Sequence, residues 1–252
     1  TLIEAFQAEG IRLPFQLDIV GFGDEEGTRF GSTLLGSRAL TSQWPASWAE
    51  LKDEDDISLA EALENFGLSF DKVSEAAIPT DNLKGYLELH IEQGPVLEEK
   101  NLPIGVVSAI AGAKRFEFTV TGMAGHAGTV PMPMRLDALA ASSEMILAVE
   151  AVAKEHGVVA TVGQISNRPN GVNVISGKTV FSLDIRSEHD QQRDVALADL
   201  MERLAKIAAK RDVILEHQQT HSANAVHCDA ALQSVLRDAI AAQNIDVHTL
   251  FS

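Results

Sequence analysis

The sequence predicts an α/β protein in which one α/β domain is interrupted by a second, two-layer domain. Short apolar runs that end at glycine, typical of strands, alternate with segments whose apolar residues recur at helical spacing. Between about residues 109 and 218 the expected order is strand, helix, strand, strand, helix, strand. This is the order of a ferredoxin-like βαββαβ domain with helices on one sheet face. We therefore expect a first domain formed by residues 1–108 and 219–252, and an inserted domain over 109–218.

The first domain is expected to place ionisable groups at the ends of two strands. The apolar run 15–22 leads into a glycine-framed turn with three consecutive acids, Asp24, Glu25 and Glu26. A second run, 86–94, alternates apolar residues with a polar face on which His90 lies between two glutamates. In open α/β sheets, ligands gather beyond the carboxyl ends of the strands. Both strand ends are therefore candidate positions for chemistry.

The inserted domain is predicted from amphipathic periodicity. The expected elements are a strand over 115–121, a helix over 134–155, strands over 158–165 and 179–186, a helix over 190–210 and a strand over 213–217. Residues 218–226 are expected to be a linker that returns to the first domain. A helix over 229–243 and a strand from about 246 would then complete that domain.

Composition narrows the class of protein. Twenty basic residues against thirty-six acidic residues give a formal charge of -16 over 252 residues, which disfavours binding to nucleic acid or to an anionic membrane surface. Cys228 is the only cysteine, so neither an intrachain disulfide nor a cysteine-based zinc cage is available. We find no signal peptide and no apolar run long enough to span a bilayer. These features favour a cytoplasmic protein.

The candidate chemistry depends on carboxylates and imidazoles. The sequence has no GxSxG elbow, phosphate-cradling loop or HExxH helix. Glu26 and His90 are suitable ligands for a zinc-like ion, and Glu25 is suited to take a proton from water. The alternatives are a solvated acidic turn and a hydrogen-bonded structural histidine. Two ligands are also fewer than the roughly three that a catalytic zinc ion normally takes from its protein.

A second group of candidates lies in the inserted domain. Three glycines surround His126, which keeps the backbone open around an imidazole at a strand-to-helix turn. Asn173 lies in a turn-rich connection, where it either forms the turn or binds a ligand. Arg186, on the polar face of a strand, either pairs with surface charge or binds a substrate carboxylate with its planar guanidinium.

Four segments together resemble one family over nearly the whole chain. They are Gly23–Gly31, Glu88–Glu98, His126–Met132 and Asn173–Arg186. The chain is similar to the hydantoinase/carbamoylase branch of the M20 metallopeptidase-like amidohydrolases. This branch contains N-carbamoyl-L-amino-acid hydrolases, β-ureidopropionases and allantoate amidohydrolases. The segment from His90 to Glu98 is the most specific part of the match.

The resemblance implies a catalytic α/β domain with two divalent metal ions (zinc, or manganese, cobalt or nickel) and an inserted dimerisation or lid domain. It implies that Glu25 is the general base, that Glu26 and His90 each bind a metal, and that His126 reaches the active site of a partner subunit in a homodimer. Asn173 and Arg186 would bind the substrate, Arg186 through its carboxylate, and Gln93 would lie near the ureido group. The expected reaction is hydrolysis of the carbamoyl or ureido C–N bond of allantoate or an N-carbamoyl-L-amino acid.

The sequence departs from the family pattern at its ends. The family's upstream histidine and bridging aspartate and its downstream histidine have no counterpart here, so we expect a truncated chain that alone binds two metals poorly and is inactive. Two other functions remain open. One is a peptidase or deacylase of the wider M20 group, and the other is a non-catalytic dimerising module of the same fold.

Overall fold

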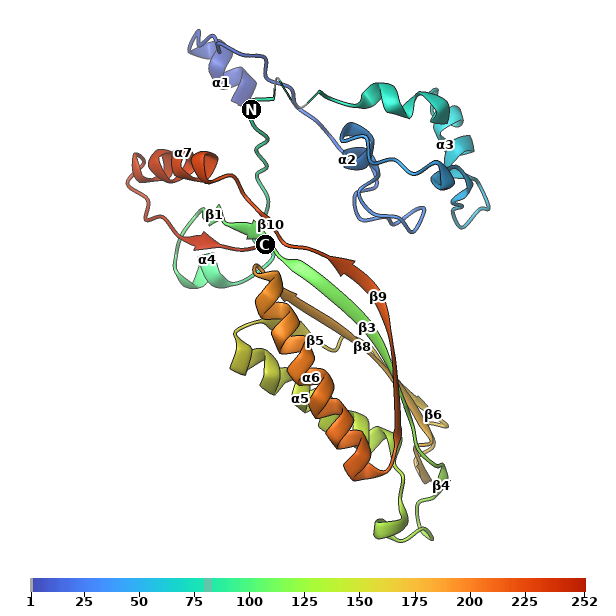
Figure 1. Cartoon of the computed structure of the whole chain (residues 1–252). Coiled ribbons are helices and arrows are strands. Elements are labelled where there is room, and N and C mark those ends of the chain that lie inside the picture. Colours follow the sequence, from blue (N-terminus) through green and yellow to red (C-terminus); the bar gives the residue numbers. More distant parts are fainter. Residues whose placement is uncertain (1, 80, 82) are drawn as a thin grey trace. The chain divides into compact units, whose positions relative to one another are not determined.

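The computed structural model describes residues 2–79, 81 and 83–252, which form a mixed α/β structure of two compact units (Figure 1). Unit 1 is Thr1–Leu87 and unit 2 is Glu88–Ser252. Each unit has an apolar cluster of its own, and the cluster in unit 2 is much the larger.

Unit 1 consists of short helical segments around a small apolar cluster. Phe30, Leu35 and Leu59 are buried, and the rings of Trp44 and Trp48 meet edge to face with centroids 5.0 Å apart. The helical segments are α1 (Leu2–Ala8), α2 (Leu35–Leu40), η1 (Ala46–Glu50), α3 (Leu59–Asn65) and η2 (Phe70–Ala76).

The strands expected over 15–22 and 86–94 are wrong for the described residues, since neither segment forms regular structure. A strand is stable only when its backbone N–H and C=O groups pair with a neighbouring strand. In the part of the chain that the structure describes, no strand pairs with either segment. Their apolar side chains are consequently exposed, Ile19 to 72% and Leu89 to 88%.

Unit 2 is built on a five-stranded antiparallel sheet with the order β5-β8-β3-β9, in which β6 also pairs with β8. Both long helices cover the same face of this sheet (Figure 1). The elements are β3 (Gly112–Thr121), α5 (Ala138–His156), β5 (Val159–Thr161), β6 (Ile165–Arg168), β8 (Lys178–Ser187), α6 (Asp190–Arg211) and β9 (Ile214–Ala223). The helices and strands expected between 115 and 217 are therefore present in order, with the expected strand over 158–165 divided into β5 and β6.

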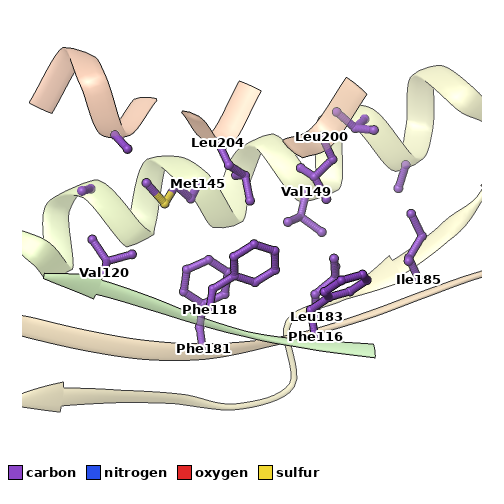
Figure 2. Close-up of a cluster of buried hydrophobic side chains, with 14 of the residues drawn as sticks. Phe116, Phe118, Val120, Met145, Val149, Phe181, Leu183, Ile185, Leu200 and Leu204 are labelled. Atoms are coloured by element: carbon purple, nitrogen blue, oxygen red, sulfur yellow. The ribbon is translucent and has the colours of Figure 1, made fainter. Parts of the chain in front are cut away.

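The core of unit 2 lies between the sheet and its two helices (Figure 2). Alternate residues of β3 and β8 point toward the helices, and the rings of Phe118 and Phe181 stack there at 5.1 Å. Met145 of α5 and Leu200 of α6 are fully buried against them. Because side chains alternate along a strand, the opposite sheet face carries the polar residues.

The linker expected over 218–226 is wrong, because β9 continues to Ala223 by pairing with β3. A register shift between Arg115 and Phe116 accommodates an extra residue on the β9 side. The chain then enters β10 (Val226–His227) almost at once.

Arg193 fixes the base of this sheet. Its buried guanidinium donates to Asp190 Oδ1 at 2.6 Å and to the carbonyl oxygen of Ala223 at 3.1 Å. Asp190 also accepts from the backbone N–H of Ala225 at 3.0 Å. A buried cation must be paired and hydrogen-bonded, so this cluster ties the start of α6 to the end of β9.

Smaller elements complete unit 2. Strand β1 pairs in parallel with β11, and β2 pairs antiparallel with β10 beside the Arg193 cluster. Near the other end of the sheet, β4 pairs with β7. These elements are α4 (Val96–Glu99), β1 (Val106–Val107), β2 (Ala109–Ile110), β4 (Gly125–His126), η4 (Met132–Met134), β7 (Val174–Ile175), α7 (Ala230–Ala241) and β11 (Thr249–Leu250). None of the described helices combines the length and apolar character needed to cross a bilayer.

Candidate active site

The acidic turn of unit 1 is fixed by the carboxylate of Asp24. Its Oδ1 accepts from the backbone N–H groups of Thr28 at 2.8 Å and Arg29 at 3.3 Å, and the Thr28 hydroxyl donates to the same oxygen at 3.1 Å. Asp24 itself adopts a left-handed conformation with φ 47°. These bonds close the turn and leave the side chains of Glu25 and Glu26 exposed at its tip.

Gly27 allows the turn to close. It has φ +68°, and a Cβ atom there would lie 2.7 Å from the carbonyl carbon of Ser32 and 2.8 Å from the nitrogen of Thr33. Any side chain would therefore push this backbone away. The backbone N–H of Leu34 also donates to the carbonyl of Glu25 at 2.8 Å. The two glutamates consequently sit on a rigid backbone, which suits groups that must hold a fixed geometry.

His90 lies at the start of unit 2 with one ring nitrogen occupied. Its Nδ1 lies 2.6 Å from the carbonyl oxygen of Ile91. A carbonyl oxygen can only accept, so Nδ1 is the donor and the lone pair of the neutral ring is on Nε2. A second nitrogen held by a backbone carbonyl is the usual arrangement for metal-binding histidines. Nearby Gln93 is exposed with φ 54°, and Glu92 accepts from the first backbone N–H groups of α4.

The described residues do not assemble a complete metal centre. Glu26 belongs to unit 1 and His90 to unit 2. No three histidine, cysteine, aspartate or glutamate side chains gather closely enough to hold an ion in the ranges 2–79 and 83–252 or at residue 81. A catalytic zinc ion normally takes about three protein ligands. Glu26 and His90 are donors of the right type for such a site, each within its own unit.

His126 and Asn173 lie together in unit 2, close to the end of the sheet where β3 leads into β4. Pairing of β4 with β7 puts His126 opposite Val174, and the backbone carbonyl of Asn173 accepts from Ala127 N–H at 2.9 Å. The side chains of His126 and Asn173 are both exposed. Two candidates separated widely in sequence are thus held by one small β-ladder.

Arg186 lies on the polar face of the sheet, paired with Asp184. Its Nε and Nη2 donate to the two carboxylate oxygens at 2.7 and 2.9 Å, and Arg115, across on β3, donates to Asp184 at 2.7 Å. Partial burial would raise the pKa of Asp184, but the hydrogen bonds from Arg186 and Arg115 hold it below the ordinary value. Two guanidinium groups share one carboxylate, which leaves a net positive charge here.

This charge borders an open groove of about 760 Å³, whose lining includes Arg115, Gln164, Asp184 and Arg186. A smaller groove of about 420 Å³ on the same face is lined by Glu117, Ser166, Arg168, Lys178 and Val180. Arg115 was not among the residues singled out from the sequence. Its alternation with Phe116 along β3 was the signal that could have placed it on this face.

Arg186 is far from His126 and Asn173 along the sheet. Lys178, at the start of β8, pairs with Thr121, close to the β4 loop, whereas Arg186 pairs with Ala113 at the opposite end of β3. The strand rises about 3.3 Å per residue, so Lys178 and Arg186 are separated by roughly 26 Å. The structure therefore brings His126 and Asn173 together but keeps Arg186 apart from them within one chain.

The fold is shared with solved amidases of the hydantoinase/carbamoylase family. A crystal structure of such an amidase from Burkholderia multivorans superposes with a TM-score of 0.92 at 30% identity, covering 100% of this chain and 61% of that chain. The model of peptidase family M20/M25/M40 matches residues 1–251, and the chain belongs to this family. Its members are generally metal-dependent.

Two curated relatives agree with the predicted branch of the family. Allantoate deiminase 1 of Glycine max is 37% identical over 90% of this chain and 52% of its own length. The N-carbamoyl-L-amino acid amidohydrolase of Geobacillus stearothermophilus is 38% identical over 92% of this chain and 57% of its own length. The chain spans about half the length of the curated relatives it matches.

Proposed function

We propose that the intact protein is a metal-dependent amidohydrolase that cleaves the carbamoyl or ureido C–N bond of allantoate or of an N-carbamoyl-L-amino acid. The observation that carries this proposal is the rigid turn that presents Glu25 and Glu26, in a chain whose relatives bear the names of such enzymes. Glu26 and His90 would each supply a ligand to one of two divalent ions, zinc or else manganese, cobalt or nickel.

Each candidate residue of this chain would have a separate role in the reaction. Glu25 takes a proton from the attacking water and passes it to the leaving nitrogen, which a carboxylate held on a fixed backbone can do. Arg186 and Arg115 provide the positive charge that holds the substrate carboxylate. Gln93 and Asn173 bind the polar atoms of the ureido group and the carboxylate, and His126 stabilises the negative charge that develops on the carbonyl oxygen.

We further propose that residues 109–218 form a ferredoxin-like dimerisation and lid domain that interrupts a catalytic domain formed by 1–108 and 219–252. The order of β3, α5, β5, β6, β8, α6 and β9 supports this. The separation of His126 from Arg186 along β8 supports a homodimer in which the two residues serve different active sites. The acidic composition and single cysteine support a cytoplasmic protein without a nucleic-acid or membrane partner.

A substrate panel tests this proposal. The intact protein, supplied with each candidate divalent metal in turn, should release ammonia from allantoate or N-carbamoyl amino acids and leave dipeptides and N-acetyl amino acids uncut. Preference for dipeptides or acyl amino acids would instead identify a peptidase or deacylase of the same family. Absence of turnover on the whole panel with every metal would favour a non-catalytic dimerising module.

A further inference from the structure

We propose that the loop after β4 holds the imidazole of His126 as the Nε2–H tautomer, with Arg135 and the backbone of Gly128 as its positioning groups. The catalytic consequence rests on the role proposed above for His126. The tautomer itself rests only on contacts in the loop. The tautomer decides whether Nε2 can donate or accept a hydrogen bond.

The tautomer follows from a hydrogen bond within the loop. The backbone N–H of Gly128 donates to Nδ1 of His126 at 3.1 Å. A backbone N–H can only donate, so Nδ1 must carry the lone pair, and the proton of the neutral ring is on Nε2. This arrangement is opposite to that of His90, whose Nδ1 faces a carbonyl oxygen. The two histidines are thus prepared for different tasks.

Arg135 holds the loop in the shape that makes this bond. Its Nη2 donates to the carbonyl of Ala127 at 2.6 Å and its Nε donates to the carbonyl of Val130 at 3.1 Å. Arg135 is half-buried, and its planar fork binds two carbonyls on either side of Gly128. The backbone N–H groups of Thr129 and Val130 both lie 3.2 Å from the carbonyl of His126 and donate to it. The loop is therefore held both by the side chain of Arg135 and by its own backbone hydrogen bonds.

Gly128 leaves room for the ring of His126. A Cβ atom at this position would lie 3.2 Å from Cε1 and 3.4 Å from Nδ1 of His126, so a side chain would press on the imidazole. The other end of the loop is fixed by pairing of His126 with Val174. The backbone of His126 is thus held by the β4–β7 pairing, and its ring by the hydrogen bond from Gly128.

A neutral ring held in this way presents a hydrogen-bond donor. Its Nε2–H can donate to a carbonyl oxygen that gains negative charge, whereas its lone pair, on Nδ1, is already engaged by the backbone N–H of Gly128. Preorganised donors aimed at a developing oxyanion contribute most when they need no rearrangement during the reaction. The tautomer thus suits His126 to the oxyanion role proposed above, with Nε2–H as the donor.

The direct test is ¹⁵N NMR of the histidine side chains in the 252-residue chain at neutral pH, with His126 assigned from the His126→Gln spectrum. The expected signal is a single Nε2–H tautomer for His126. An Nδ1–H tautomer, or an even mixture of the two, would overturn the proposal. Because this measurement needs neither substrate nor metal, it decides the tautomer even if the proposed reaction is wrong.

Variants of Arg135 then connect the loop to turnover in the intact protein. Arg135→Ala should convert the His126 signal to a mixture of tautomers and lower kcat about 10- to 100-fold with a smaller change in KM. Arg135→Lys, which keeps a cation and some donors, should lie between. The control is Arg203→Ala, which removes an arginine of α6 that is paired with the carboxylates of Glu155 and Asp199 and should change neither the signal nor kcat.

The outcomes separate this inference from the proposed function. If Arg135→Ala keeps a single tautomer and full kcat while His126→Ala is impaired, the positioning role of Arg135 is wrong and the role of His126 stands. If His126→Ala has normal turnover, the oxyanion role falls even when the tautomer is as expected. Loss of folding in Arg135→Ala would transfer the decision to Arg135→Lys, in which an unchanged tautomer and kcat would refute the positioning role.

Discussion

Glu25 and Glu26 are neighbours in sequence, yet their proposed tasks differ, and the closed turn explains how both are held. Asp24 binds the backbone N–H groups that follow the pair, and Gly27 permits the close approach of Ser32 and Thr33. The turn thus fixes the backbone and leaves the two carboxylates exposed.

Replacement of Glu25 by Gln tests the division of roles. The amide keeps the shape of the side chain but cannot take a proton, so turnover of a ureido substrate by the intact protein should fall by about 10²–10⁴-fold. Bound metal, measured by elemental analysis, should not change. Glu54→Gln, at an exposed position of unit 1, is the control and should behave like the wild type. Near-normal turnover of Glu25→Gln would exclude it as the base.

Single residues also show where sequence reasoning reaches its limit. The glycine-framed turn and the loop around His126 were identifiable because glycine has a restricted set of uses in tight backbone. The role of Arg135 was not identifiable from the sequence. Its partners are the backbone carbonyls of Ala127 and Val130, which any residue type would supply. The pairing of Arg186 with Asp184 was only one of two open interpretations, since an arginine on a strand surface suits either.

At the scale of elements, the sheet and helices of unit 2 form because a local pattern specifies them. Phe116, Phe118 and Val120 alternate with polar residues on β3. The local sequence pattern therefore predicts which face of the strand is buried. The segments 15–22 and 86–94 have a similar pattern, but a strand also needs a partner. Pairing is a non-local property, and none of the described strands pairs with them. Their local pattern was identified correctly and their structure was not.

The core of unit 2 should be sensitive to loss of Phe118. Its side chain is fully buried and stacks on Phe181, so Phe118→Ala should lower the free energy of unfolding by about 3–5 kcal/mol. Phe66→Ala, at a position 83% exposed in unit 1, should have little effect. Urea unfolding followed by far-ultraviolet circular dichroism, to which α5 and α6 contribute strongly, provides the comparison. Equal midpoints for the two variants would contradict the assigned core.

Ion pairs between α5 and α6 predict an acid dependence of stability. Hydrogen bonds from Lys210 and Arg211 lower the pKa of Glu144 below the ordinary glutamate value of 4.5. A carboxylate with a lowered pKa in the folded state stabilises the protein above its unfolded pKa and loses this contribution as pH falls through the folded value. The pairs are partly exposed, so the effect should be modest and weaker at high salt.

Glu144→Gln isolates this contribution. The variant should melt at a lower temperature than the wild type at pH 7, and the difference should shrink steadily as pH falls below about 4.5. Thermal melting across this range gives the comparison, with Glu216→Gln on the exposed strand β9 as the control. A difference in melting temperature that stays constant down to pH 3 would show that the Glu144 pairs are not its source.

At the scale of the whole molecule, the spacing of functional residues suggests exchange between subunits. His126 lies near the end of the sheet that leads into β4, and Arg186 lies near the opposite end. One small substrate therefore cannot contact both residues of the same chain. In a symmetric dimer, each active site could combine Arg186 of one subunit with His126 of the other.

Mixing two inactive variants tests that exchange. His126→Ala and Arg186→Ala should each impair turnover of the intact protein, and refolding them together should restore about a quarter of wild-type activity, since half of the dimers carry one intact site of two. Each variant refolded alone is the control. No recovery in the mixture, with dimers demonstrated by light scattering, would show that each active site takes His126 and Arg186 from the same subunit.

The junction at the base of the sheet has a consequence for protein engineering. Strand β2 leads into the sheet and β10 leads out of it, yet the two are hydrogen-bonded neighbours beside the buried Arg193 cluster. A segment whose two ends meet can be removed, or transplanted, without stretching what surrounds it. A tight turn that joins β2 to β10 could therefore replace the long stretch of chain between these two strands. The same stretch could also be exchanged between related chains.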